Sequence, residues 1–326
     1  MTTLITGGAG FVGLALAERL RADGEPVVLF DRAAPRADLL ARLGRPQRDG
    51  LGIVLGDIRC PGDVDAALKS SGVDRVVHCA AITPNAEREA REPMAVLDIN
   101  VGGTANLLQR CALGRSGIRR VLVLSSVAVY GIRPPAGATY EEDVSVPAPA
   151  ALYGVSKLAS EQAALRLADL YRMDVRVARL GPVYGPWEHA TGVRDALSPH
   201  AQVLAAAVAG QPVVLPRSLR ADWLHARDAA RALALLSAAE DLAHAVYNVG
   251  GSVMTDLVQW CQLLAPSFPG WRWKLADAGE PGTLHYNLPV DRAALSIARL
   301  QADTGWAPTT PLTQAVRDQL VWQAAA

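Results

Sequence analysis

The sequence predicts an α/β fold, with a doubly wound parallel sheet followed by a smaller C-terminal lobe. A short apolar run at residues 2–6 leads into a glycine-rich turn and then into a helical pattern. Strand-like apolar runs then alternate with helical patterns, which favours parallel strands joined by helices. The alternation ends near residue 181, and a tryptophan-containing region follows. We therefore assign residues 1–180 to the sheet domain, with 221–250 returning to it, and 181–326 mainly to the lobe.

The turn Gly7-Gly8-Ala9-Gly10-Phe11-Val12-Gly13 fits both G-x-G-x-x-G and G-x-x-G-x-x-G. Glycine is expected there because the turn is tight and the backbone must approach a pyrophosphate at a helix N-terminus. A strand before the turn and a helix after it make a dinucleotide site the stronger interpretation, against a plain glycine turn. The sheet is therefore predicted to be of the Rossmann type. We expect cofactor contacts from Gly7, Gly10, Phe11, Val12 and Gly13.

Composition excludes several classes of protein. The 326 residues contain 50% hydrophobic and 20% charged residues, enough to bury a sizeable core. Lys+Arg and Asp+Glu number 32 each, so no net charge favours nucleic acid or an anionic membrane. The four cysteines form no C-x-x-C pair, so we expect cytosolic thiols and no metal site. No apolar run is long enough to span a bilayer and no leader is visible, so we expect a cytoplasmic protein.

The second and third strands, predicted at 27–30 and 52–55, end in candidate adenosine contacts. Asp31 follows Gly13 at close to the roughly 20-residue interval at which a carboxylate meets the adenosine ribose. Such a carboxylate accepts hydrogen bonds from both ribose hydroxyls and repels a 2′-phosphate, which favours NAD over NADP. Arg32 argues the other way, because a guanidinium can pair with a 2′-phosphate. Asp57 and Ile58, after the third strand, are placed to contact the adenine ring.

The alternation continues through the first half of the chain. Strands are predicted at 73–78, 120–124 and 174–180, and helices at 61–71, 93–113 and 151–171. The small residues Ala80 and Ala81 follow the fourth strand and would let a cofactor lie against backbone. His78, at the end of that strand, is more simply a hydrogen-bonded structural histidine than a catalyst.

The C-terminal part is less regular. A loop is predicted at 181–187, helices near 198–209 and 227–239, and strands at 213–215 and 246–249. We expect this part to cover the cofactor and hold the substrate. Its loop from Trp187 to Asp195 carries donors and acceptors for hydroxyl groups, and Arg194 can pair with a carboxylate. The candidate substrate residues are Ser126, Glu188, His189, Thr191, Arg194 and Arg220.

The chemistry is predicted to lie with Ser126, Tyr153 and Lys157. Tyr153 and Lys157 are one helical turn apart and share a face. An ammonium and a cationic nicotinamide nearby would lower the pKa of the tyrosine, which can then take a proton from an alcohol. Ser126, at the end of the fifth strand, can orient the same oxygen. Lys157 would also bind the nicotinamide ribose.

With these residues in place, the chain resembles the extended short-chain dehydrogenase/reductases, the nucleotide-sugar epimerases and dehydratases. The resemblance covers nearly the whole chain and implies a Ser/Thr–Tyr–Lys triad and a tightly held NAD. It also implies a homodimer formed through the helices 93–113 and 151–171. It rests on Thr6 through Gly13, Asn100-Val101-Gly102-Gly103-Thr104, Ser126 through Gly131, Tyr153 with Lys157, Arg179 through Pro186, Asp222-Trp223-Leu224-His225 and Gly305-Trp306-Ala307-Pro308. Asn100 is accordingly added to the cofactor residues.

Departures from the family pattern narrow the reaction. Val127 and Ala128 stand where family dehydratases carry Asp-Glu, which argues against a 4,6-dehydratase, and Pro182 replaces a usual Asn. Ala221 and Glu280 stand where diphosphate-binding arginines are usual, and a carboxylate beside a diphosphate repels it.

We therefore expect an NAD-dependent oxidoreductase acting on a secondary alcohol or ketone of a sugar, polyol or sugar acid. A nucleotide-sugar 4-epimerase, which makes no net NADH, is the alternative. A non-catalytic NAD-sensing binding protein is the rival from another class, although such relatives typically lose the tyrosine that this chain keeps.

Overall fold

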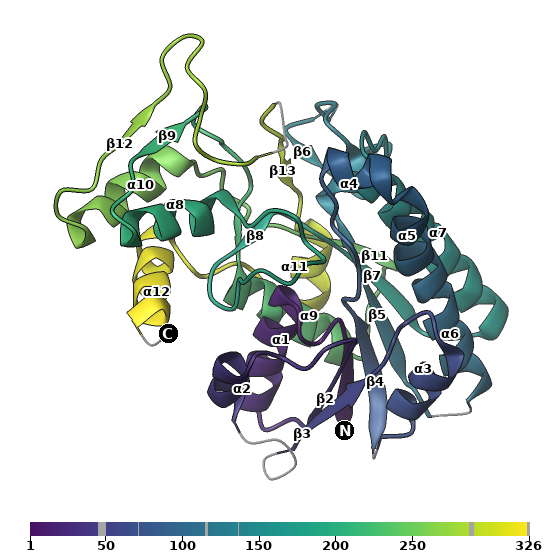
Figure 1. Ribbon diagram of the computed structural model, residues 1–326. Helices are drawn as coiled ribbons and strands as arrows, with labels where there is room; N and C mark the ends of the chain where they lie inside the picture. The colour runs from purple at the N-terminus through teal and green to yellow at the C-terminus, as the bar shows by residue number, and fades with distance from the viewer. Residues whose placement is uncertain (45–49, 71, 115–116, 136, 287–289, 325–326) are drawn as a thin grey trace.

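The computed structural model describes residues 1–44, 50–70, 72–114, 117–135, 137–286 and 290–324. Its centre is a seven-stranded sheet in the order β11-β7-β5-β4-β1-β2-β3, and every neighbouring pair in it is parallel. The strands are β1 (Thr2–Thr6), β2 (Val27–Asp31), β3 (Leu51–Leu55), β4 (Val73–His78), β5 (Arg120–Ser126), β7 (Val175–Leu180) and β11 (Val246–Val249). The predicted doubly wound α/β sheet is therefore confirmed (Figure 1).

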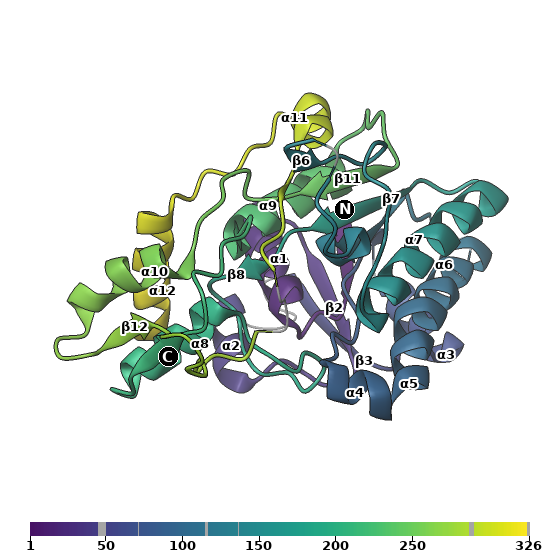
Figure 2. The ribbon, with the colours of Figure 1, turned by 90° about the horizontal axis from the view of Figure 1, so that it is seen from above.

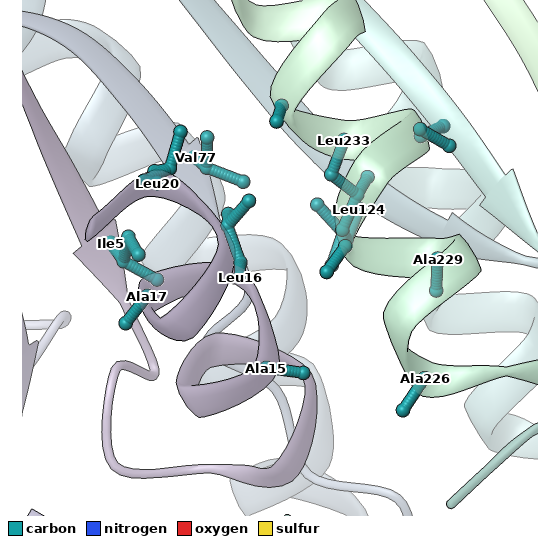
Figure 3. Close-up of a cluster of buried hydrophobic side chains, with 14 of the residues drawn as sticks. Ile5, Ala15, Leu16, Ala17, Leu20, Val77, Leu124, Ala226, Ala229 and Leu233 are labelled. Carbon is teal, nitrogen blue, oxygen red and sulfur yellow. The ribbon is translucent and has the colours of Figure 1, made fainter. Parts of the chain in front are cut away.

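Helices cover both faces of the sheet because successive strand residues point to opposite sides. Ile5 packs on one face with Leu16 and Leu20 of α1 (Figure 3). Leu4 packs on the other face with Leu107 of α6. The first face carries α1 (Phe11–Ala22), α2 (Ala37–Leu43) and α9 (Ala226–Ala238). The second carries α3 (Pro61–Leu68), α5 (Pro93–Leu97), α6 (Gly103–Leu113) and α7 (Leu152–Tyr171). The helix predicted at 61–71 thus ends earlier, and residue 71 lies outside the described residues.

The helix predicted at 93–113 is present, and its middle is a π-helical segment. Between α5 and α6 the chain forms a π-helical turn, η1 (Asp98–Gly102). Within it the side chain of Asn100 accepts a hydrogen bond from the Ile82 N–H at 2.8 Å and donates to the Ile82 carbonyl at 3.0 Å. A π turn shifts the helical register by one residue and is frequent at functional sites. Here it brings Asn100 to the loop after β4.

The C-terminal part forms a separate layer beside the sheet (Figure 2). Its core contains Trp223, Trp260 and Leu257. Its elements are α8 (Pro199–Val208), β9 (Val213–Leu215), α10 (Leu257–Leu264), η3 (Ala265–Ser267), β12 (Trp273–Leu275) and α12 (Leu312–Ala324). Short elements join the two parts, namely η2 (Val127–Tyr130), β6 (Thr139–Tyr140), β8 (Val183–Tyr184), β10 (Leu224–His225), β13 (Ala294–Leu295), α11 (Ala298–Thr304) and α4 (Ala86–Arg91).

Two sets of contacts hold the C-terminal residues against elements that come earlier in the chain. The buried carboxylate of Asp228 in α9 accepts from the backbone N–H groups of Thr309 and Thr310. The centre of the Trp322 ring in α12 lies 4.6 Å from the centre of the buried Trp187 ring. The Arg42 guanidinium of α2 lies over the Trp322 ring, 3.9 Å from its centre. Within the described ranges, no helix is long and apolar enough to cross a membrane.

Candidate active site

A cleft of about 330 Å³ opens at the carboxyl ends of the strands. From β1 the chain adds β2 and β3 on one side of the sheet, and then returns to add β4 on the other side of β1. Open α/β sheets bind ligands at such a reversal of strand order. Most of the residues predicted from the sequence line this cleft. They are Gly7, Gly10, Phe11, Val12, Gly13, Asp31, Arg32, Asp57, Ile58, Ala80, Ala81, Ser126, Tyr153, His189, Thr191 and Arg194.

The glycines of the turn allow the first helix to approach the sheet closely. Gly7 has φ +66°, and a Cβ on it would lie 2.7 Å from the Ala80 nitrogen. A Cβ on Gly13 would lie 2.5 Å from the Gly7 carbonyl oxygen. Both positions therefore need glycine to let the protein's own backbone pack, before any ligand is considered. The result is a tight turn that presents the start of α1 to the cleft.

The acidic residues behind the turn are already oriented. The Asp31 carboxylate accepts from the Ala9 and Arg32 N–H groups at 3.0 and 2.7 Å. Asp57 forms an ion pair with Arg59 at 2.6 Å, and hydrogen bonds from that guanidinium lower the pKa of Asp57. The sequence analysis did not single out Arg59, although Asp57-Ile58-Arg59 is a visible stretch after β3.

The side chains of Thr83 and Ser126 lie within hydrogen-bonding reach of the Tyr153 hydroxyl. Burial raises the pKa of Tyr153, and hydrogen bonding with these side chains and the positive charge of Arg194 offset part of the rise. The protein alone therefore shifts this pKa upward, opposite to the direction expected from Lys157 and a cationic nicotinamide together. The cause is desolvation, which the sequence argument left out.

Lys157 is 4% exposed and does not line the cleft. It lies near Cys79, which does line the cleft and interacts with Lys157 electrostatically. Burial lowers the pKa of Lys157 to about 8, while the charge of Glu161 favours the ammonium. Glu161 itself grips Arg179 through both carboxylate oxygens, at 2.7 to 3.2 Å. Arg179 also donates to the Tyr130 hydroxyl at 2.8 Å, so a buried polar network joins α7, β7 and η2.

Three other candidates lie away from the cleft lining. Asn100 uses its amide on Ile82 and on the Ser156 hydroxyl, so it shapes the loop after β4 rather than facing the cleft. Glu188 has a side chain 1% exposed and holds Arg194 and Ser198. Arg220 is exposed, and its neighbour Ala221 pairs with Thr255 through the backbone. Asn100 was predicted from the family resemblance, and Glu188 and Arg220 from residue type and position, and neither kind of argument reveals these contacts.

His78 is the structural histidine expected. Its ring nitrogens lie 2.6 Å from the Thr6 hydroxyl and 2.9 Å from the Thr104 hydroxyl, and burial lowers its pKa to about 3. Thr83, by contrast, lines the cleft but was missed by the sequence analysis. Its only sequence signal is its place in Ile82-Thr83-Pro84, just beyond the small residues after β4. Among the described residues, no cluster of His, Cys, Asp and Glu could hold a metal ion.

A dinucleotide-type turn and a partly buried tyrosine at one cleft define an oxidoreductase of the short-chain dehydrogenase class. The chain belongs to the NAD dependent epimerase/dehydratase family, whose model matches residues 3–250. This membership confirms the sugar-modifying, NAD-dependent enzyme expected from the sequence and disfavours a non-catalytic sensor.

Individual relatives match along almost the whole length. A dTDP-L-rhamnose 4-epimerase from Burkholderia thailandensis is 23% identical over 98% of this chain and 94% of its own. The structure of a Thermus thermophilus UDP-glucose 4-epimerase with NAD is 25% identical, covers 100% of both chains and has a TM-score of 0.81. MoeE5 in complex with UDP-glucuronic acid and NAD is 26% identical, covers 99% of both chains and has a TM-score of 0.78.

Proposed function

We propose that this protein is a nucleotide-sugar 4-epimerase. It would oxidise the hexose 4-hydroxyl with NAD and allow the 4-keto sugar to rotate in the cleft. The hydride would then return to the opposite face of the sugar C4. The observation that carries the proposal is the joint lining of one cleft by the glycine turn, Ser126 and Tyr153. The 4-epimerase names of full-length relatives support it.

The chain's own residues would divide the work as follows. Gly7 through Gly13 and Asp31 would bind the dinucleotide, which supplies the hydride acceptor. Tyr153 would take the proton from the sugar hydroxyl, and Ser126 would orient that oxygen. Lys157 would hold a positive charge at the nicotinamide ribose. His189, Thr191 and Arg194 line the cleft and would contact the sugar.

The nucleotide would depend on a different arginine from those usual in the family. Glu280 is bound to Lys274 at 2.8 Å, which offsets the repulsion that we expected it to exert on a diphosphate. Arg292 is partly buried, donates to the Gly131 carbonyl and lines a small hollow that shares Pro182 with the cleft. It is a candidate partner for the diphosphate.

The second candidate is a net dehydrogenase of a free sugar or sugar acid, which the loss of arginine at Ala221 and Glu280 favours. One experiment separates the two. The protein is incubated with NAD and UDP-glucose, UDP-glucuronic acid, dTDP-glucose or free aldoses and aldonates, and both NADH and the sugar products are measured. A 4-epimer without net NADH supports the epimerase. Stoichiometric NADH from a free sugar, with no reaction of any nucleotide sugar, would overturn it.

We further propose a cytoplasmic homodimer. None of the four cysteines, all of which lie in the described part of the chain, is joined in a disulfide, as is usual in a reducing compartment. Met94 of α5, Leu113 of α6 and Val155 and Leu170 of α7 are exposed apolar side chains on the helices expected to pair. Sedimentation analysis tests the dimer, and a monomer at micromolar concentration would contradict it.

A further inference from the structure

Thr83 is fixed by a loop that comes from far along the chain. Its N–H donates to the Val193 carbonyl at 2.8 Å, and its own carbonyl accepts from the Asp195 N–H at 3.2 Å. Between these bonds Thr83 and Arg194 pair as a parallel β-bridge. Both backbone groups of Thr83 are thus held by the loop 188–195, and they set the direction in which its side chain leaves the chain.

The loop is itself held in register with Thr83. Arg88 of α4 donates to the Gly192 carbonyl and to the Asp195 carboxylate, both at 2.9 Å. The Asn85 N–H donates to the same carboxylate at 3.0 Å. Inside the loop, the buried Glu188 binds Arg194 at 2.8 Å. These bonds leave the loop little freedom to slide along residues 83–88.

The Thr83 side chain completes the connection at the cleft. It lies within hydrogen-bonding reach of the Tyr153 hydroxyl, as does the Ser126 side chain, and all three residues line the cleft. A hydroxyl that donates to a phenolate stabilises it and fixes which lone pair remains free to meet a substrate proton. The placement of the loop therefore reaches the Tyr153 hydroxyl through the Thr83 side chain, in addition to the charge of Arg194.

We infer that Thr83 is a positioning residue for the tyrosine, and that it transmits the placement of the loop 188–195 to the Tyr153 hydroxyl. This inference rests on the proposed acid/base role of Tyr153. Thr83 does not exchange a proton with the substrate. It holds the phenolate oxygen in place while the substrate proton arrives, and a displaced loop would release it.

Other charged groups around Tyr153 must be accounted for in any titration. Arg194 faces it from the loop, and the Glu89 carboxylate of α4 accepts the Tyr153 backbone N–H at 3.2 Å. Lys157 lies one turn further along α7, and His189 lines the same cleft. A variant at Thr83 leaves all four in place, so a shift in the tyrosine titration reports the lost hydroxyl.

The test uses the full-length protein saturated with NAD and needs no substrate. Phenolate absorbance is followed against pH for the parent and for Tyr153→Phe, and the difference isolates Tyr153. Thr83→Val, which keeps the shape of the side chain but removes its hydroxyl, should raise the pKa of Tyr153 by about one unit. Thr83→Ser, which keeps the hydroxyl, should stay within about 0.3 unit of the parent.

A second variant tests the link to the loop. Arg88→Met removes two hydrogen bonds to the loop and leaves the cleft lining unchanged. It should raise the pKa of Tyr153, as Thr83→Val does. If Thr83→Val does not bind NAD, Thr83→Ala takes its place. The inference would be overturned if the pKa of Tyr153 in Thr83→Val or Thr83→Ala equalled that of the parent protein. It would also be overturned if Thr83→Ser shifted this pKa as much as Thr83→Val, or if Arg88→Met did not shift it. Failure to turn over any nucleotide sugar would count against the proposed function and leave this result standing.

Discussion

The Asp31 carboxylate and the Ala9 backbone N–H are joined by a hydrogen bond of 3.0 Å, which ties the end of β2 to the glycine turn. The other carboxylate oxygen accepts from the Arg32 N–H at 2.7 Å. Each carboxylate oxygen keeps a further lone pair, so the group is oriented by the protein and can still accept from hydroxyl groups. The turn and the carboxylate therefore form one preassembled unit.

The first prediction concerns cofactor choice. Asp31→Ala should weaken NAD binding about tenfold and narrow its preference over NADP, because the variant loses two acceptors for ribose hydroxyls and the charge that repels a 2′-phosphate. Fluorescence titration with both cofactors measures this. Asp31→Asn is the matched control for charge alone. Tighter binding of NADP than of NAD by the parent protein would contradict the assignment.

The second prediction concerns the reaction. Tyr153→Phe removes the acid/base hydroxyl and should lower turnover by roughly a hundredfold or more, with NAD affinity nearly unchanged. Steady-state rates and cofactor titration are measured on the same preparation. Substantial turnover in Tyr153→Phe would exclude the proposed triad.

The third prediction uses the lowered pKa of Lys157, about 8. Below that pH the side chain is an ammonium, and above it the charge is lost, so NAD affinity should fall as pH rises from 7 to 9.5. The expected loss is roughly tenfold, the scale of a hydrogen bond to a charged group. Lys157→Met should bind NAD weakly at every pH, with no inflection near 8. An inflection that survives in this variant would assign it to another group.

The fourth prediction concerns stability in acid. Burial lowers the pKa of His200 to about 3 and of His225 to about 4. The His200 ring stacks on Tyr184 and the His225 ring meets Tyr184 edge-on, and the ring nitrogens of both histidines have no hydrogen-bond partner. They stay neutral in the folded protein, while the unfolded chain takes up protons below its ordinary histidine pKa of about 6.5. Stability should therefore fall as pH drops from about 6.5 to 4, by at most about 1.4 kcal/mol per pH unit for each histidine.

Urea unfolding at several pH values measures that slope. His78 has a similarly lowered pKa and contributes in the same direction. His200→Phe keeps an aromatic ring on Tyr184 but cannot titrate, so its stability should depend less steeply on pH than that of the parent. An identical slope would show that His200 is not the source.

The fifth prediction concerns the buried pair of Glu161 and Arg179, which are 0% and 5% exposed at their side chains. Glu161→Ala leaves the guanidinium buried without its counter-charge and should cost about 3–5 kcal/mol of unfolding free energy. Thermal and urea unfolding measure it. Glu18→Ala, at a solvent-accessible position of α1, serves as a comparison expected within about 0.5 kcal/mol. A similarly small loss for Glu161→Ala would contradict the account of the network.

The sequence predicted the fold and most of the cleft because those features depend on local order. Periodicity identifies strands and helices, and parallel strands bring their carboxyl ends together, so Gly10, Asp31 and Tyr153 had to meet. Thr83, Asn100 and Glu188 follow a different rule. Their roles depend on contacts with residues distant in the sequence, and residue type alone does not indicate which partner will be near. Desolvation at Tyr153 was missed for the same reason.

The contact between the Trp187 ring and the Trp322 ring of α12 has a consequence for biosynthesis. The loop that lines the cleft begins next to Trp187, yet one of its supports is translated far later. A nascent chain on the ribosome can complete the glycine turn and the first six strands while Trp187 still lacks that partner. We therefore expect the dinucleotide site to form earlier in synthesis than the fully supported loop beside it.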